Sequence, residues 1–148
     1  MRRRVPFLCL LLLAGACSLP RWPVDAPITS PFGLRRMGFW PSTHHGVDLA
    51  VPEGTPVRAM AGGRVVHAGP YGAYGITVVI EHNRNLVTLY AHLKEAHVRV
   101  GDEVNGRQVI GLSGRSGNAT GPHLHFEVRR WGQPEDPVPL LGGPPRPR

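Results

Sequence analysis

The stretch GPHLHFEVRR, residues 121–130, places two histidines one residue apart in a segment with the composition of a β-strand. Because side chains of a strand alternate between its two faces, His123 and His125 point to the same side, together with Glu127. The apolar residues between them face the opposite, buried side: Leu124, Phe126 and Val128. Two imidazoles directed into one space are suited to metal binding or to proton transfer.

A second group of metal-binding residue types lies earlier, in THHGVDLAVPEGTPV, residues 43–57. We expect Gly46 to allow a sharp or left-handed backbone that directs His44 and Asp48 to one point. Zinc accepts imidazole nitrogen and carboxylate oxygen, and a catalytic zinc site has three protein ligands with one position left for water. The chain thus offers His44, Asp48 and one of the two strand histidines as a metal site. His45 competes with His44 for its place in that set.

The remaining histidines show which further side chains could join such a site. All eight histidines lie between positions 44 and 125. His92 ends the segment LVTLYAH, where strict alternation puts it on the same side as Tyr90. Catalytic groups often lie at strand ends, so His92 is a candidate. We expect the histidines at positions 67, 82 and 97 to lie beside turns or on exposed strand edges, without a chemical role.

The elements that position these residues are predicted to be short strands. Apolar runs rich in valine, isoleucine and threonine alternate with glycine, asparagine and proline, and no segment shows helical periodicity over three turns. This pattern predicts an all-β domain. The runs GITVVIEH and LVTLYAHL flank the polar residues 82–85, which predicts an antiparallel hairpin.

The first residues of the chain have the organisation of an export signal. Three arginines at positions 2–4 precede an apolar run and then small residues before Cys17. The segment LAGAC resembles a bacterial lipobox, which would place cleavage before Cys17 and a lipid on that cysteine. The alternative is cleavage at the same place without modification of Cys17. The only other cysteine is in the apolar run, so the processed chain would contain no internal disulfide.

We predict four segments from composition. Residues 1–16 form the signal peptide, and residues 17–27 form a lipidated N-terminus and an extended, proline-rich tether. Residues 28–138 form one compact domain, since their number suits one core. Residues 139–148 end in GGPPRPR, which has little to bury, and we expect a disordered tail.

The charge distribution excludes one class of partner. The formal net charge is +7, but part of it belongs to the three leading arginines, and the domain has adjacent basic pairs only at 35–36 and 129–130. A nucleic-acid surface requires a clustered basic stripe, so we expect no nucleic-acid partner. A mildly positive protein suits an anionic polymer such as cell wall, although solubility explains the same charge.

Four motifs in a fixed order are similar to those of the lysostaphin/LytM-type zinc metallopeptidases, which cut peptide cross-links in bacterial peptidoglycan. They are ITSPFGLR, HHGVDLA, YAHL and GNATGPHLHFEV, and the resemblance covers about residues 27–137. It implies a compact antiparallel β domain of the duplicated-hybrid-motif type with a substrate groove. The residues it implies are three Zn²⁺ ligands and two catalytic histidines: His44, Asp48 and His125, and His92 and His123.

The chain has no HExxH motif, so the glutamate base of many zinc proteases is absent. Zinc lowers the pKa of a bound water from 15.7 to about 7. His92 and His123 would share the proton transfers, in an order that the sequence leaves open. For Glu127 we favour a supporting role over that of the base.

Three functions remain open at this point. The first is a zinc endopeptidase, and the second is a non-catalytic activator of a separate wall hydrolase, although such relatives typically lack a ligand residue. The third is a zinc-stabilised wall-binding lipoprotein, although structural zinc sites usually have four protein ligands. We expect an exported, monomeric membrane lipoprotein that faces the periplasm and acts on peptidoglycan peptide stems. Cross-links between D-Ala and a diamino acid suit that location better than the oligoglycine bridges cut by lysostaphin.

Overall fold

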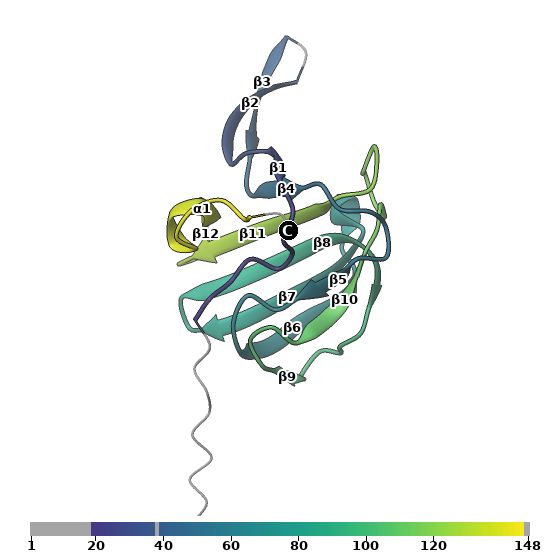
Figure 1. The fold of residues 1–148 in the computed structure, drawn as a ribbon, viewed down its shortest axis with the longest axis vertical. Coiled ribbons are helices and arrows are strands. Elements are labelled where there is room, and N and C mark those ends of the chain that lie inside the picture. Colours follow the sequence, from purple (N-terminus) through teal and green to yellow (C-terminus); the bar gives the residue numbers. More distant parts are fainter. Residues whose placement is uncertain (1–18, 38, 147–148) are drawn as a thin grey trace, which may run out of the picture.

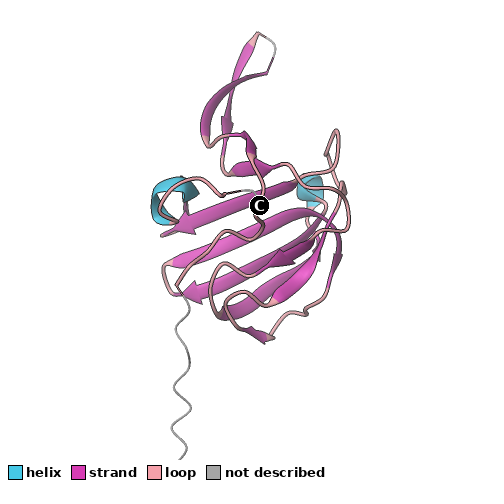
Figure 2. Ribbon diagram, in the orientation of Figure 1, coloured by secondary structure: helices cyan, strands magenta, loops and turns pink. Residues whose placement is uncertain are grey.

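The computed structural model describes residues 19–37 and 39–146, and most of them form antiparallel strands (Figures 1 and 2). The predicted all-β class is confirmed. Within these ranges, helical structure is limited to the 3₁₀ turn η1 (Gly72–Tyr74) and the short helix α1 (Pro137–Leu140). No helix in the described ranges is long and apolar enough to cross a membrane.

A ten-stranded sheet forms the body of the domain. Its strands are β1 (Ile28–Ser30), β4 (Val47–Leu49), β5 (Pro56–Arg58), β6 (Gly63–Pro70), β7 (Ile76–Asn83), β8 (Leu86–Ala96), β9 (Glu103–Val104), β10 (Val109–Ser113), β11 (Leu124–Arg130) and β12 (Gln133–Glu135). The main path runs β1-β4-β11-β8-β7-β6-β9, while β10 pairs with β5 and β8 and β12 pairs with β11. β11 therefore lies between β4 and β8, so the two histidine-containing motifs become neighbours.

The predicted hairpin between residues 76 and 93 is confirmed. β7 and β8 pair antiparallel, with Val79 opposite Leu89, and the connection is a tight turn at residues 84–85. The side-chain oxygen of Asn83 accepts a hydrogen bond from the backbone N–H of Asn85 at 2.9 Å, which stabilises the turn.

The core lies on one face of β11, as its alternation predicts. Leu124, Phe126 and Val128 are fully buried, and the ring of Phe126 packs against Tyr90 at a centroid distance of 5.3 Å. The phenol oxygen of Tyr90 accepts a hydrogen bond from the backbone N–H of Met60 at 2.8 Å. Burial of these large rings fixes the register of β11, and a one-residue slip of this strand would move His125 to the opposite face.

The prediction of an extended tether over residues 17–27 is wrong for its described part. Trp22, Val24 and Ala26 are only 5–7% exposed and belong to the core. The indole Nε1–H of Trp22 donates to the carbonyl of Gly143 at 2.9 Å, and its ring meets Phe126 edge-on at 6.1 Å. Alternation of apolar side chains among the prolines therefore directs this segment into the domain.

The predicted disordered tail from residue 139 is also wrong for its described start. α1 begins after Asp136, whose carboxylate caps the helix by accepting from the N–H of Val138 at 3.0 Å. Leu140 and Leu141 pack against the core. The signal peptide of residues 1–16 and the lipidation site Cys17 lie outside the described residues, and they stay predictions.

A separate hairpin projects from the body of the domain (Figure 1). It consists of β2 (Gly33–Met37) and β3 (Trp40–His44), which form their own two-stranded sheet. Phe39 and Trp40 near its tip are exposed. At its base, His44 is 4% exposed, so the hairpin delivers one candidate metal ligand into the body of the protein.

Candidate metal and catalytic site

Strand pairing brings the candidate ligands together. β4 and β11 pair antiparallel with Asp48 directly opposite His125, and β3 ends at His44. Of the two backbone conformations expected for Gly46, sharp or left-handed, the left-handed one is not observed. This glycine is needed for space, because a Cβ there would collide with the carbonyl oxygen of Phe126 and lie 2.8 Å from Cγ of Glu127. The short connection can therefore pass directly against β11.

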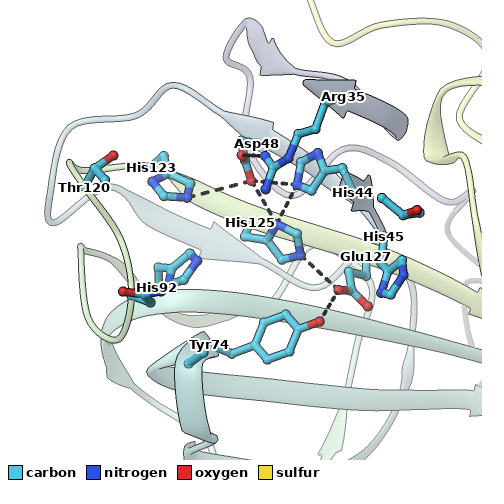
Figure 3. Close-up of a pocket in the computed structure, with 13 residues that line it drawn as sticks. Arg35, His44, His45, Asp48, Tyr74, His92, Thr120, His123, His125 and Glu127 are labelled. Carbon is cyan, nitrogen blue, oxygen red and sulfur yellow. Dashed lines mark hydrogen bonds and ion pairs between the residues drawn. The ribbon is translucent and has the colours of Figure 1, made fainter. Parts of the chain in front are cut away.

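Three ligand atoms converge at one point, as Figure 3 shows. Nε2 of His44 lies 3.1 Å from Nδ1 of His125 and 3.2 Å from Oδ1 of Asp48. Nδ1 of His125 lies 2.8 Å from the same oxygen of Asp48. Two ligands of a tetrahedral zinc ion with bonds of about 2.0–2.1 Å lie ~3.3 Å apart, so these spacings are close to those of a zinc site.

The outer partners of the two imidazoles fix their tautomers. Nδ1 of His44 lies 2.8 Å from the carbonyl oxygen of Pro31, which can only accept, so this nitrogen carries the proton. Nε2 of His125 lies 2.9 Å from a carboxylate oxygen of Glu127, so it is the donor in that ring. The lone pairs of His44 Nε2 and His125 Nδ1 are therefore both directed at Asp48.

These three ligand atoms fit a bound cation. In these tautomers, the three converging atoms are all acceptors, and a hydrogen bond among them is impossible unless an imidazole is protonated a second time. Metal-binding histidines usually donate their other N–H to a carboxylate or a backbone carbonyl, as both do here. Two imidazole nitrogens and one carboxylate oxygen are ligands that zinc accepts.

The two neighbouring imidazoles favour the ionised form of Asp48. Burial alone would raise the pKa of Asp48, but the attraction of His125 and His44, which can donate to this carboxylate once they are protonated, outweighs burial and holds the pKa far below its usual range. For His125, burial would lower the pKa, and the hydrogen bonds to Asp48 and Glu127 raise it instead. The carboxylate is thus a ready anionic ligand, while protons compete with a metal for His125.

Glu127 accepts a hydrogen bond from Nε2 of His125 and is fully buried. It accepts hydrogen bonds from the phenol of Tyr74 at 2.7 Å and from the guanidinium of Arg129 at 2.7 Å. Burial would raise its pKa, but bonds from His125, Tyr74 and Arg129 lower it to about 2. Burial and the contact with Glu127 raise the pKa of Tyr74 to about 12. Glu127 is thus an anion held in place by three donors.

Two more imidazoles, those of His92 and His123, face the same cavity, and each donates from Nδ1 to a backbone carbonyl. Nδ1 of His92 donates to the carbonyl of Ser116 at 2.8 Å, and Nδ1 of His123 donates to the carbonyl of Gly121 at 2.9 Å. Their ring centroids are 4.7 Å apart, and Nε2 of His123 lies 3.7 Å from Asp48 Oδ1. Burial is the main cause that lowers the pKa of His92. His92 is therefore neutral at pH 7, with the lone pair of its Nε2 available.

Strict alternation predicted the wrong face for His92. It places His92 with Tyr90, whose side chain is in the core, whereas His92 lines the cavity. The structural reason is a β-bulge in β8, where Ala91 and His92 together lie opposite the single residue Thr77 of β7, and His92 has a φ of +59°. Left-handed backbone is uncommon for residues other than glycine and clusters at functional sites. Here it turns one side chain out of the core and into the site.

The cavity around these groups has a volume of about 360 Å³. All five histidine and aspartate residues of the predicted site line it, together with His45, which is exposed and does not join the cluster. Arg35 and Tyr74 also line the cavity, whereas Trp40 and Tyr71 do not. The backbone carbonyls that orient the imidazoles could not be found from sequence, because they carry no residue signature.

The family model described as "Peptidase family M23" matches residues 42–137, which contain every residue of this site. The chain belongs to peptidase family M23. Lysostaphin/LytM-type proteins are among its structural relatives, so the resemblance seen in the sequence is confirmed. The antiparallel β fold of the family is the fold observed here.

Proteins similar to this chain include both a peptidase and an activator of a hydrolase. "DD-carboxypeptidase/endopeptidase Mpg" of Neisseria meningitidis serogroup B is 47% identical over 114 residues, which are 75% of this chain and 26% of Mpg. "Murein hydrolase activator EnvC" of Escherichia coli is 38% identical over 139 residues, which are 90% of this chain and 32% of EnvC. The chain therefore spans about a quarter to a third of the length of these relatives.

A solved structure agrees with the fold. A zinc-containing peptidase from Vibrio cholerae has a TM-score of 0.77 and 36% sequence identity, over 84% of this chain and 40% of the other. The similarity thus extends over most of the chain.

Proposed function

We propose that this chain is a zinc-dependent endopeptidase that hydrolyses peptide cross-links of bacterial peptidoglycan. Zn²⁺ would be held by His44, Asp48 and His125, while His92 and His123 act as the catalytic histidines. Membership of a peptidase family and the names of its relatives support peptide hydrolysis in the cell wall. The observation that carries the proposal is the convergence of three acceptor atoms within 3.2 Å, beside two imidazoles held for proton transfer.

The chemistry divides among these groups. When bound, zinc would polarise the scissile carbonyl and lower the pKa of a water molecule. Because Nδ1 of each ring donates to a backbone carbonyl, the neutral tautomers of His92 and His123 have their lone pair on Nε2. Either Nε2 can take a proton from the attacking water and return it to the leaving amine. Tyr74, Arg129 and Glu127 would keep His125 in the orientation that this geometry requires.

An activator role is the second candidate, and the similarity to EnvC over 90% of the chain favours it. An activator does not need a complete catalytic set. Here the three candidate ligands converge, and Nδ1 of His92 and of His123 is held by a backbone carbonyl. This arrangement supports the enzyme. A wall-binding protein with purely structural zinc is less well supported, because the cluster has three ligand residues and opens into a cavity.

Export and a lipid on Cys17 complete the proposal, with the protein facing the periplasm as a monomer. The structure limits how far from the membrane such an anchor lets the domain lie. Only residues 18–21 separate Cys17 from the buried Trp22, so the Cα atoms of Cys17 and Trp22 can lie at most about 18 Å apart, when this segment is fully extended. A lipidated chain would therefore act on wall very close to its membrane.

The proposal is tested with the full chain, purified in detergent, loaded with zinc and incubated with cross-linked muropeptide dimers. Mass spectrometry of the products identifies the bond that is cut. His123→Ala should abolish cleavage and retain zinc, while His97→Ala is the matched control, since His97 is exposed and its side chain pairs with the nearby Glu95. His44→Ala should lose zinc, whereas His45→Ala should keep it.

Intact dimers with zinc bound to the wild-type protein would reject the endopeptidase for these substrates. The activator would then be favoured if the chain stimulates a separate wall hydrolase in the same assay. Unfolding on chelation, with no cleavage in any condition, would favour the structural zinc site.

A further inference from the structure

The part of the chain that the structure describes has two buried side-chain polar atoms without a hydrogen-bond partner, and they lie on one cross-strand pair. They are Nε of Arg35 and Oγ of Ser42. Arg35 on β2 and Ser42 on β3 are directly opposite each other in the projecting hairpin. Buried polar groups in native proteins nearly always have partners, so each exception calls for an explanation. The Nε–H of Arg35 can only donate, and the hydroxyl of Ser42 can also donate, so an acceptor placed here would satisfy both groups.

Arg35 extends from the hairpin to the wall of the catalytic cavity (Figure 3). Among the described residues that line this cavity, it is the single lysine or arginine. Its side chain is 37% exposed, so the outer nitrogens of the guanidinium are within reach of a ligand in the cavity. A permanently charged group beside three candidate metal ligands suits an anion rather than a neutral peptide.

The present contacts of Arg35 leave most of its capacity unused. Its Nη1 donates to Oγ of Ser30 at 3.2 Å and lies 3.7 Å from Oδ2 of Asp48. The second distance exceeds the roughly 2.7–2.9 Å of a charge-assisted hydrogen bond. Arg129 shows the contrast, because its Nε and Nη2 both bind Glu127 at 2.7 Å. The guanidinium of Arg129 is thus occupied by a carboxylate of the protein, whereas that of Arg35 can still bind a ligand.

We infer that Arg35 binds a free carboxylate of the substrate, on the residue that supplies the scissile nitrogen. This inference rests on the proposed endopeptidase. In such a substrate the carboxylate carbon is three covalent bonds from the scissile carbonyl carbon. Nη1 of Arg35 lies 3.7 Å from Oδ2 of the candidate metal ligand Asp48. The carboxylate of the substrate can therefore contact Arg35 while its scissile carbonyl lies at the metal site. A planar guanidinium pairs with a carboxylate through two parallel hydrogen bonds.

The consequence is a choice between two classes of cross-link. A cross-link to a diamino acid with a free carboxylate beside the scissile nitrogen carries the required charge. An oligoglycine bridge does not, because the corresponding carbonyl is part of the next peptide bond. Arg35 would therefore be a specificity-determining residue that selects anionic cross-links.

The test compares two synthetic peptides that differ in one group. Each joins D-Ala to a diamino acid, with either a free carboxylate or a carboxamide beside the scissile nitrogen. The full zinc-loaded chain should cleave the carboxylate peptide with a kcat/KM at least about tenfold higher, since a site built for a polar group discriminates strongly against its absence. Arg35→Gln should bring this ratio to about one by lowering kcat/KM for the carboxylate peptide alone.

The matched control is Arg36→Gln, which removes the same charge from the next residue of β2, where the side chain is exposed. It should keep the wild-type ratio, and Arg35→Lys should lie between the two. Zinc content is measured for every variant. An equal loss on both peptides in Arg35→Gln would overturn the inference and assign Arg35 to the support of Asp48. An unchanged ratio in this variant would also overturn it.

Failure of the proposed function gives a different result. If the wild-type chain cleaves neither peptide, binding of both to the zinc-loaded protein is measured by calorimetry. Tighter binding of the carboxylate peptide that is lost in Arg35→Gln would still support the anion subsite. Equal binding of the two peptides would reject it.

Discussion

Nε2 of His125 lies 2.9 Å from Oε1 of Glu127, two residues further along the same face of β11. The strand period of two makes this contact possible, because residues i and i+2 share a face. The contact fixes the proton of His125 on the side away from Asp48. One strand therefore supplies both a candidate metal ligand and the group that orients it.

Glu127→Gln should weaken zinc binding by roughly 10- to 100-fold, as the loss of such outer partners usually does. The amide keeps the size of the side chain but removes the charge that raises the basicity of His125. Zinc affinity is measured at pH 7 by competition with a chelator. Glu135→Gln is the control, because it removes the same charge from a surface pair with Arg130. Equal affinities in the two variants would contradict a role of Glu127 in the site.

The core beneath the site predicts a loss of stability at alkaline pH. Burial, opposed by hydrogen bonds with Met60 and Thr88, raises the pKa of Tyr90 to about 12 from 10.0. An acid whose folded pKa is raised favours folding only while it is protonated. The contribution is therefore fully present below pH 10 and is lost as pH rises toward 12, up to about 3 kcal/mol.

The measurement is urea unfolding of the wild type and Tyr90→Phe between pH 8 and pH 11.5. The free energy of unfolding should fall more steeply with pH in the wild type, because phenylalanine has no group to ionise. Parallel pH profiles of the two proteins would show that the phenol of Tyr90 ionises equally well when folded.

The backbone at His92 predicts a contrast between two substitutions. Asparagine tolerates the left-handed region, whereas the β-branched valine does not. His92→Val should therefore be about 1–2 kcal/mol less stable to urea than His92→Asn, although both remove the imidazole and should lose cleavage. If the two variants are equally stable, the φ of +59° is not required by the surrounding strands.

Particular residues show why sequence reasoning succeeded for some parts of this molecule and not for others. The alternation of β11 is set by three buried apolar residues, so the common face of His123 and His125 could be predicted from local pattern alone. The antiparallel hairpin of β7 and β8 also has a local cause, which is the polar turn between two apolar strands.

The predictions that were wrong depend on distant contacts. His92 leaves the strand alternation because of a bulge in β8 opposite residues 76–78, and the residue types of Ala91 and His92 do not signal a bulge. Trp22 is buried because Phe126 and Gly143, more than 100 positions away, provide its partners. A proline-rich segment looks like a linker until those partners are known. Arg35 and Tyr74 likewise acquire meaning only from the cavity that they line.

The packing of Trp22 can be tested by its removal. Trp22→Ala should lower the free energy of unfolding by about 3–5 kcal/mol, since a large ring that is 7% exposed leaves the core. Leu19→Ala is the control, because Leu19 is 77% exposed and should change stability by less than about 0.5 kcal/mol. Urea unfolding of the zinc-loaded proteins measures both.

A loss below about 1 kcal/mol in Trp22→Ala would mean that residues 19–27 detach easily and can act as a tether after all. The domain of a lipidated chain could then move further from its membrane. The expected large loss would instead bind this segment to the body of the domain. It would limit the free connection after Cys17 to residues 18–21, and so confine cleavage to the wall layer nearest the anchor.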